Sequence, residues 1–596
     1  MRQRIEHLEV MVKRLVTPRQ GISPSIISSS EGSRGEGAIR TPEMTRVGTT
    51  VIDAVHSVYK PTDDWYDVLR EVNELKKVWI ETLDEPADLQ STLSNSVDGT
   101  SLLFGQVDRV DVPEILSSLP PKAEVDKLIQ WFFDRKTFTL SIPPIIHEPT
   151  FMQEYNDHWK DPSKTSVIWI GLLFSILGIT MVAAQFGGPP EYEGVSEPKF
   201  HHYRQRTAQC LLMGDIAKCL PYTIETLRFN ATAELNRKDD NSRGLWIMTG
   251  VIVRAAVNMG YHRDPDHTPY LSILKAEYRR RVWLSVKSMD EVASFLSGFP
   301  RMLPAINSDT KEPQNLYDWE LCEETTALPL PRPLSEPTPA TYLIAKGRLF
   351  HGLGEIIDFI NGPCPDNYPR AIQIDQLLCN LWLNIPSLMK VDADQVERSS
   401  FRTPIDYSTL QLACMYHHGI CTLHRKFTRK DGSDLPGHIS RSRCLASSLA
   451  LIDYQRLFQP SWYTSSRTRQ MLVPAAIILL LELETRRRGP EVDSEIQADT
   501  ILKAFESAVG LWKDASGSCD EAWKVYKTLN NMLRGLKTID STNPLPLLSA
   551  NVWNGSPSEP SSALRMPDDN GIDWAWWDNL LDGSWPYDEQ DLARGP

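Results

Sequence analysis

The sequence has little cysteine and no apolar leader. Its 9 cysteines in 596 residues are odd in number and without regular spacing, so they do not build a disulfide scaffold. The chain opens with MRQRIEHLEVMVKRL, which is charged and periodic and therefore unlike a secretory signal. Basic residues are also in the minority, 63 against 77 acidic ones, giving a net charge of -14. This balance excludes a general nucleic-acid binder, because phosphate contacts need a positive surface.

The common catalytic and metal-binding motifs are missing. The chain has no G-x-S-x-G elbow, no H-E-x-x-H, no phosphate loop and no dinucleotide fingerprint. One apparent helix carries Cys414, His417, Cys421 and His424, but its first and last residues would lie about 15 Å apart. One straight helix cannot place four ligands around a single zinc ion. We therefore predict no catalytic residues and no metal site, with an unfamiliar all-helical enzyme as an open alternative.

The period of apolar residues predicts an all-α fold, a large multi-helix domain over residues 121–537 with disordered linkers and a disordered tail. No convincing run of alternating strands is present. Pro143, Pro144 and Pro149 predict an irregular turn. The expected helices cover 122–133, 166–184, 202–213, 223–236, 243–259, 273–297, 340–360, 372–382, 407–424, 442–457, 468–487, 497–514 and 519–534.

The chain begins with two heptads that predict a short dimerisation helix at 1–17. After Met1, the apolar seam consists of Ile5, Leu8, Val12 and Leu15. A plain surface helix is the alternative, since two heptads are marginal alone. Residues 18–120 are expected to be mostly disordered linker with one helix near 64–79, and 538–567 to be a second linker.

The run Val167–Ala184 contains no charge and touches the lower length limit for a membrane span. Ser175 and Thr180 interrupt it, and Lys164 is the only flanking cation. We predict a core helix that is buried on all sides, and no membrane partner. A membrane span stays open as an alternative.

Two arginine triplets, 279–281 and 486–488, could contact nucleic acid, but both have acidic neighbours. Glu277 and Asp290 share the first helix, and Glu482 and Glu484 precede the second triplet. We interpret both triplets as structural ion-pair sites.

The segment 568–596 combines acidic and large apolar residues, which is typical of transcriptional activation segments. The acidic residues keep the apolar ones solvated and available to a partner's groove. The alternative is a tail that docks on its own body. The predicted activation residues are Trp574, Trp576, Trp577, Leu580, Leu581 and Trp585.

Residues 244–301 have a distinctive order: a helix, a glycine stop, a His-Arg-Asp turn, a helix with an arginine triplet, and Gly-x-Pro. This stretch resembles the middle homology region of fungal binuclear zinc-cluster transcription factors. PPIIHEPTFMQEY (143–155) and YHHGICTLHRKF (416–427) resemble other segments of that family. The matching positions, to which the resemblance gives a structural role, are Arg254, Gly260, His262, Arg263, Asp264, Arg279, Arg280, Arg281, Trp283 and Asp290.

The resemblance implies a nuclear transcription regulator of a metabolic or biosynthetic gene set. Its partners would be a second chain in a homodimer or heterodimer, the transcription machinery, promoter DNA directly or through a partner, and a small-molecule effector. The family's six-cysteine zinc cluster is not in this sequence, whose first cysteine is Cys210. Zinc is therefore expected only if such a cluster lies upstream, in a gene assigned a late start. The alternative is a chain that lost its DNA reader and acts as an adaptor or inhibitor on a full-length relative.

Overall fold

The computed structural model describes residues 49–52, 57–60, 107–134, 137–237, 242–268, 270–391, 407–429, 435–488 and 496–539. Over these ranges the predicted all-α fold class is confirmed. The heptads at 1–17, the helix near 64–79, residues 540–567 of the predicted linker 538–567 and the segment 568–596 lie outside the described residues. Residues 538 and 539 belong to a helix, so the predicted start of that linker was two residues too early.

Every helix predicted between residues 121 and 537 is present, although three begin four to seven residues before the predicted start. The helices are α3 (Val112–Ser117), α4 (Lys122–Phe133), α5 (Glu148–Lys160), α6 (Val167–Gln185), α7 (Ser196–Gly214), α8 (Thr223–Leu235), α9 (Ser242–Asn258), α10 (Ile273–Ser297), α11 (Pro339–Ile360), α12 (Tyr368–Leu383), α14 (Tyr407–Arg425), α15 (Leu435–Gln455), α16 (Ser466–Arg488), α17 (Ala498–Ala515) and α18 (Asp520–Ile539).

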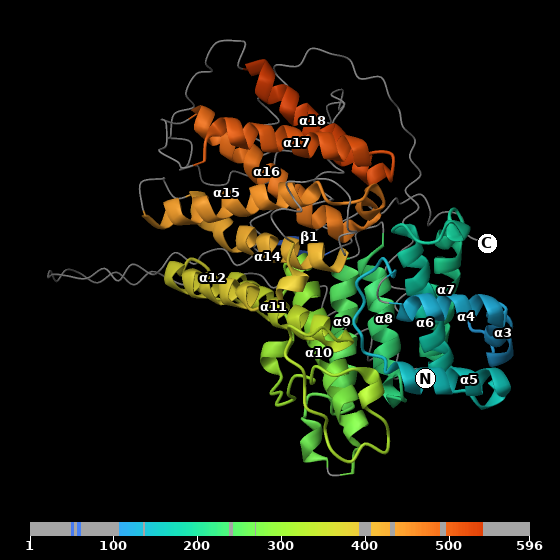
Figure 1. The fold of residues 1–596 in the computed structure, drawn as a ribbon. Coiled ribbons are helices and arrows are strands. Elements are labelled where there is room, and N and C mark those ends of the chain that lie inside the picture. Colours follow the sequence, from blue (N-terminus) through green and yellow to red (C-terminus); the bar gives the residue numbers. More distant parts are fainter. Residues whose placement is uncertain are drawn as a thin grey trace, which may run out of the picture. The chain divides into compact units, whose positions relative to one another are not determined.

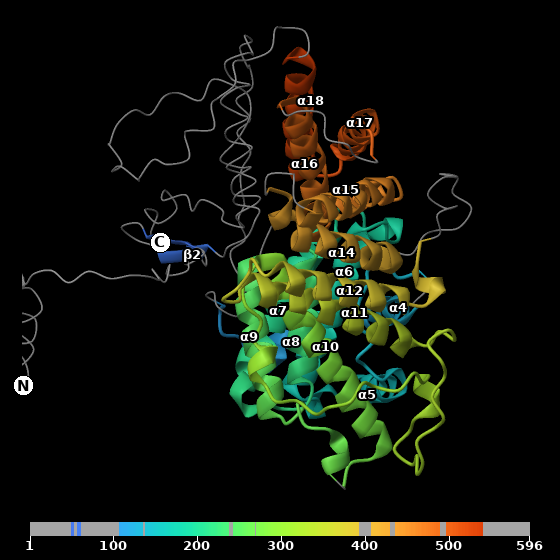
Figure 2. The same ribbon diagram turned by 90° about the vertical axis from the view of Figure 1, so that its left-hand side faces the viewer.

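Helices that follow one another in the chain also pack together. Helix α6 packs against α7 and α8, α9 against α10, α10 against α11, α14 against α15, and α16 against α17. The ribbon colours accordingly pass from teal through green and yellow to red along neighbouring helices (Figures 1 and 2). One cluster of buried apolar side chains runs from Ile115 in α3 to Leu536 in α18. The described helices thus share a single core.

Two short helices were not predicted from the sequence. Helix α5 begins at Glu148, and Pro149 lies in its first turn, where a missing N–H costs no helical hydrogen bond. The ring of His147 caps this end by accepting a hydrogen bond from the backbone N–H of Thr150. The prediction of an irregular turn through Pro149 was therefore wrong, because this proline starts a helix. Helix α3 begins in the same way, with Asp111 as its cap.

The structure also contains a small hairpin that the sequence did not predict. Strand β1 (Thr49–Ile52) pairs antiparallel with β2 (Ser57–Lys60), so that Thr49 lies opposite Lys60. Both strands contain β-branched residues, which suit extended backbone. Strands of four residues are too short for an alternating pattern to stand out.

Helix α6 is the apolar run that the sequence predicted to be buried. Among the described residues it is the one helix with the length and hydropathy of a membrane span. However, 89% of its most apolar 18-residue stretch is buried inside the protein. Its neighbours α7, α8 and α4 cover it. The burial that α6 needs is thus supplied by other helices.

Two glycines of α6 differ sharply in the space around them. A Cβ at Gly171 would stand 2.8 Å from Cβ of Cys210, whereas at Gly178 the nearest atom, Cβ of Tyr203, is 3.8 Å away. We expect Gly171→Ala to lower the free energy of unfolding by about 1–3 kcal/mol through overpacking. The matched change Gly178→Ala should leave it unchanged or raise it by up to about 1 kcal/mol, because alanine is the better helix former. Urea denaturation followed by circular dichroism measures both. Equal effects of the two changes would contradict the close α6–α7 packing.

Candidate functional site around the turn between α9 and α10

The turn between α9 and α10 is set by a glycine in the left-handed region. Gly260 has φ of +74°, and the backbone N–H of Tyr261 donates to the carbonyl of Ala256 at 3.0 Å. Gly260 N–H donates to Val257 at 2.9 Å, so the pair forms a Schellman-type helix end. Helix α10 then starts after Ser272, whose hydroxyl accepts from Lys275 N–H. Both ends are thus fixed by local residues.

Arg280 is the centre of the ion pairs at this turn. Its guanidinium donates to Asp264 at 2.7 and 3.2 Å, to Asp266 at 2.7 Å and to Glu277 at 2.7 Å. Only 7% of the Arg280 side chain and 3% of the Asp264 side chain are exposed. Burial alone would raise the pKa of Asp264, but the hydrogen bonds from Arg280 and from backbone N–H groups hold that pKa well below its usual range.

The same carboxylates also accept hydrogen bonds from the backbone of the segment that follows α10. Asp264 accepts from Lys311 N–H at 2.8 Å, and Glu277 accepts from Gln314 N–H at 2.7 Å. In return, Asp309 accepts from Asp264 N–H at 2.9 Å. Asp264 and Glu277 therefore each accept from Arg280 and from a backbone N–H, so the turn and residues 309–314 are held as one unit.

The two neighbouring arginines point elsewhere, because consecutive residues on a helix differ by about 100° in direction. Arg279 donates to the carbonyl of Met259 at 2.7 Å and lies over the Tyr261 ring, 4.2 Å from its centroid. Arg281 pairs with Asp318 at 2.5 Å. Asp318 in turn accepts from Glu148 N–H at the start of α5. All three arginines are thus used inside the protein.

The other predicted motif residues take separate positions. Trp283 is buried and donates to Ser308 at 2.9 Å. His262 faces Trp283, with ring centroids 6.4 Å apart, and Arg263 is exposed, 3.8 Å from Asp309. Arg254 is exposed on α9 and takes part in none of these contacts.

Asp290 is not a partner of the arginine triplet, although it shares α10 with it. It accepts from the backbone N–H groups of Met302 and Leu303 at 2.9 and 3.0 Å. Burial raises the pKa of Asp290 to about 6, while those two hydrogen bonds act in the opposite direction. Nearby, Arg301 pairs with Asp358 at 2.6 Å and with Glu355 at 3.0 Å, a network that the sequence did not indicate.

The first two arginines of the second triplet also form ion pairs within the protein. Arg486 donates to Glu482 at 2.5 Å, and Arg487 to Glu484 at 2.8 Å. Arg441 from α15 shares Glu482. These acidic partners are the ones that the sequence places before the triplet.

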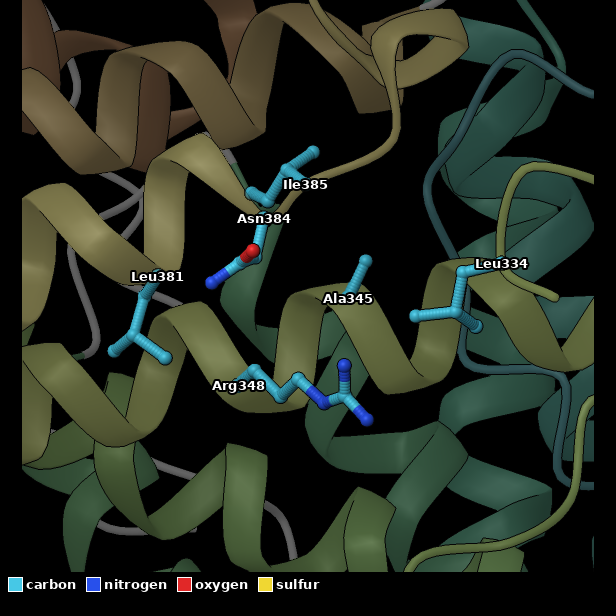
Figure 3. A pocket seen from close by; sticks show the side chains of 6 residues that line it. All are labelled: Leu334, Ala345, Arg348, Leu381, Asn384 and Ile385. Atoms are coloured by element: carbon cyan, nitrogen blue, oxygen red, sulfur yellow. The ribbon is translucent and has the colours of Figure 1, made fainter.

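A pocket of about 340 Å³ lies beside α11 and α12 (Figure 3). Its lining contains no carboxylate, histidine or thiol, and its one charged group, Arg348, pairs with Glu312 at 2.6 Å. The lining residues are Leu334, Ala345, Arg348, Leu381, Asn384 and Ile385. This composition carries no acid–base or nucleophilic chemistry.

The cysteines and histidines of α14 do not converge on a zinc ion. Cys421 faces Ser448, the ring of His417 lies 5.6 Å from that of Tyr454, and His424 contacts Ser440 at 3.1 Å. Burial lowers the pKa of His417 to about 4, so its ring is neutral at physiological pH. Within the described ranges, no three His, Cys, Asp or Glu side chains are arranged to hold a metal.

Comparison with known proteins shows which family this sequence matches. Residues 129–335 match the fungal specific transcription factor domain, a range that includes the whole motif at 244–301. The Equisetin cluster transcription factor eqxF of Fusarium heterosporum is 31% identical over 77% of this chain and 70% of its own length. The Zn(2)-C6 fungal-type transcription factor mpsB of Macrophomina phaseolina is 30% identical over 82% of this chain and 68% of its own length.

The chain belongs to the family of Zn(2)-C6 fungal-type transcription factors. The family resemblance seen in the sequence is thereby confirmed. The relative pigI of Monascus ruber, also named a Zn(2)-C6 fungal-type transcription factor, is 31% identical over 81% of this chain. The match spans 62% of the length of that relative.

The free energy of unfolding should depend on pH through Asp264. Its folded pKa is lowered, so its contribution is present above the ordinary carboxyl pKa and is lost as pH falls toward the folded value. We expect Asp264→Asn to lower the free energy of unfolding by about 1–3 kcal/mol near neutral pH, and by less below about pH 4. Urea denaturation at several pH values measures this, with exposed Asp499→Asn as control. A loss independent of pH would contradict the ion-pair role.

Asp290 should show the opposite pH dependence. Its folded pKa is raised to about 6, so the stability it contributes is present below the ordinary carboxyl pKa and is lost as pH rises through 6. The wild type should therefore lose up to about 3 kcal/mol between about pH 4 and pH 7 through this group. Asp290→Asn should flatten that part of the stability profile. If the free energy of unfolding of the variant varies with pH as that of the wild type does, burial does not raise the pKa of Asp290.

Proposed function

We propose that this chain is a transcription regulator that acts in the nucleus on a metabolic gene set. Family membership carries the proposal. One relative is named for the equisetin cluster, and another is named the Fusarisetin A cluster transcription factor, from Fusarium sp.. These names support a biosynthetic gene cluster as the kind of target.

The charges of the helical body support a regulatory role over direct DNA contact. All triplet arginines whose side chains the structure describes are used in interactions within the protein, and the net charge of the chain is -14. Neutralising phosphates would require free cations on the surface. Promoter DNA would be reached through a six-cysteine zinc cluster joined to this chain or through a partner. The helical body would then respond to a small molecule or partner, without catalysis.

The two ends of the chain complete the proposal. The seam of Ile5, Leu8, Val12 and Leu15 would join two copies, or one copy and a relative, as a coiled coil. The acidic-aromatic segment 568–596 would recruit the transcription machinery through a short amphipathic helix.

The activation segment can be tested in the full chain fused to a neutral DNA-binding module. We expect the fusion to activate a reporter gene, and the change of Trp574, Trp577 and Trp585 to Ala to bring activity near background. These side chains would supply most of the apolar surface for the partner's groove. Reporter output at equal protein level is the measurement.

Trp553→Ala is the matched control, since Trp553 lies outside the acidic segment. It should leave reporter output unchanged. Full activity in the triple variant would remove the activation role of residues 568–596.

A further inference from the structure

Three cations from distant parts of the chain are buried within the helical body. Arg228 lies on α8, Lys346 on α11 and Arg467 on α16, and their exposed fractions are 3%, 6% and 2%. Buried charges in proteins are ordinarily paired or bound to a ligand. Three such groups in one region therefore raise the question of what compensates them.

Several buried arginines elsewhere in the body have carboxylate partners. Arg204 pairs with Glu234, Arg280 with Asp264, and Arg301 with Asp358. By contrast, no carboxylate among the described residues forms an ion pair with Arg228, Lys346 or Arg467. The three cations therefore lack the acidic partner that Arg204, Arg280 and Arg301 have.

The few polar contacts of the cluster are to neutral groups. Arg228 donates to the carbonyl of Ser285 at 3.1 Å and to the hydroxyl of Thr232 at 2.5 Å. Within the described residues, Lys346 and Arg467 hydrogen-bond to no protein atom, and the buried Nε of Arg467 and Oγ of Ser285 are unpartnered. Donors that need an acceptor are thus left over inside the protein.

Aromatic side chains stand around these cations. The ammonium of Lys346 lies 5.6 Å from the ring centroid of Tyr342 and 5.2 Å from that of Phe350. The Tyr407 hydroxyl lies 3.2 Å from that of Thr468, the residue after Arg467. Helices α8, α10, α11, α14 and α16 each contribute to this region.

Arg228 and the chain at Lys346 both lie beside the same turn of α10. Arg228 donates to the carbonyl of Ser285, and a Cβ at Gly347, the residue after Lys346, would stand 2.7 Å from Cδ1 of Leu284. Burial, followed by repulsion from Arg467, lowers the pKa of Arg228 to about 9. Burial, together with repulsion from Arg467 and Arg228, lowers the pKa of Lys346 well below its usual range. A negative charge placed among them would relieve both effects.

We propose that Arg228, Lys346 and Arg467 form the binding site of a small organic anion that carries carboxylate or phosphate groups. The two guanidinium groups would hold the anion through charge-assisted hydrogen bonds. Lys346 would add a positive charge, and Tyr342 and Phe350 would contact the apolar part of the ligand. An effector role for this anion rests on the regulatory function proposed above, whereas its binding does not.

The test is the thermal unfolding of the full chain with citrate, succinate, inorganic phosphate or glycerol phosphate, each at matched ionic strength in NaCl. Comparing the two carboxylates with the two phosphates shows which acidic group the site binds. Triethyl citrate, which is neutral, shows whether apolar contacts alone raise the Tm. For at least one anion we expect a rise in Tm of about 3 °C once its concentration reaches roughly 100 times its Kd.

Lys346→Met and Arg467→Met should each abolish this rise. Without anion, each variant should unfold at the wild-type temperature or above it, because a buried unpaired charge has been replaced by an apolar chain of similar length. Lys346→Gln provides a second variant if the methionine does not fold. Lys503→Met is the matched control on the surface, where Lys503 pairs with Asp499, and it should keep the rise.

Two results would overturn the proposal. One is a wild-type Tm that none of the four anions raises. The other is a rise that persists in the folded variants of Lys346 and Arg467. A rise confined to the wild type and Lys503→Met, in a chain that does not activate the reporter, would support the anion site and count against the regulatory function.

Discussion

The buried ion pair between Arg280 and Asp264 holds together the turn between α9 and α10. It can form only because Gly260 ends α9 with a left-handed residue and turns the chain back toward α10. Once formed, it orients Asp264 to accept the backbone of residue 311. The segment that follows then brings Asp318 to Arg281 and to the start of α5. One buried pair thereby links helices that are far apart in the sequence.

Compensation of buried charge explains why basic residues of this chain do not signal DNA binding. An exposed arginine triplet could bind phosphate, but here each described triplet arginine is used within the body. Buried cations without a carboxylate partner therefore need another source of negative charge. Arg228, Lys346 and Arg467 lack acidic partners, and leaving them unpaired would be unfavourable in a low-dielectric interior. A receptor for an acidic small molecule would have this arrangement.

Local sequence patterns predicted the helices well and their ends less well. The period of apolar residues found every helix from 121 to 537 except α5, because amphipathic faces follow directly from the order of residues. Helix α5 was missed, because a proline can start a helix as readily as it can end one. The hairpin at 49–60 was missed because four-residue strands leave too little pattern.

The sequence by itself determined the family, the all-α fold, the glycine-stopped turn and the short-range pairs such as Arg280 with Glu277, three residues apart on one helix. Only the tertiary structure decided which distant groups meet. It paired Arg281 with Asp318, turned Asp290 away from the arginines, and gathered Arg228, Lys346 and Arg467. Contacts between neighbours on one helix follow from its fixed geometry. Contacts between helices depend on how the entire core packs, which no local pattern records.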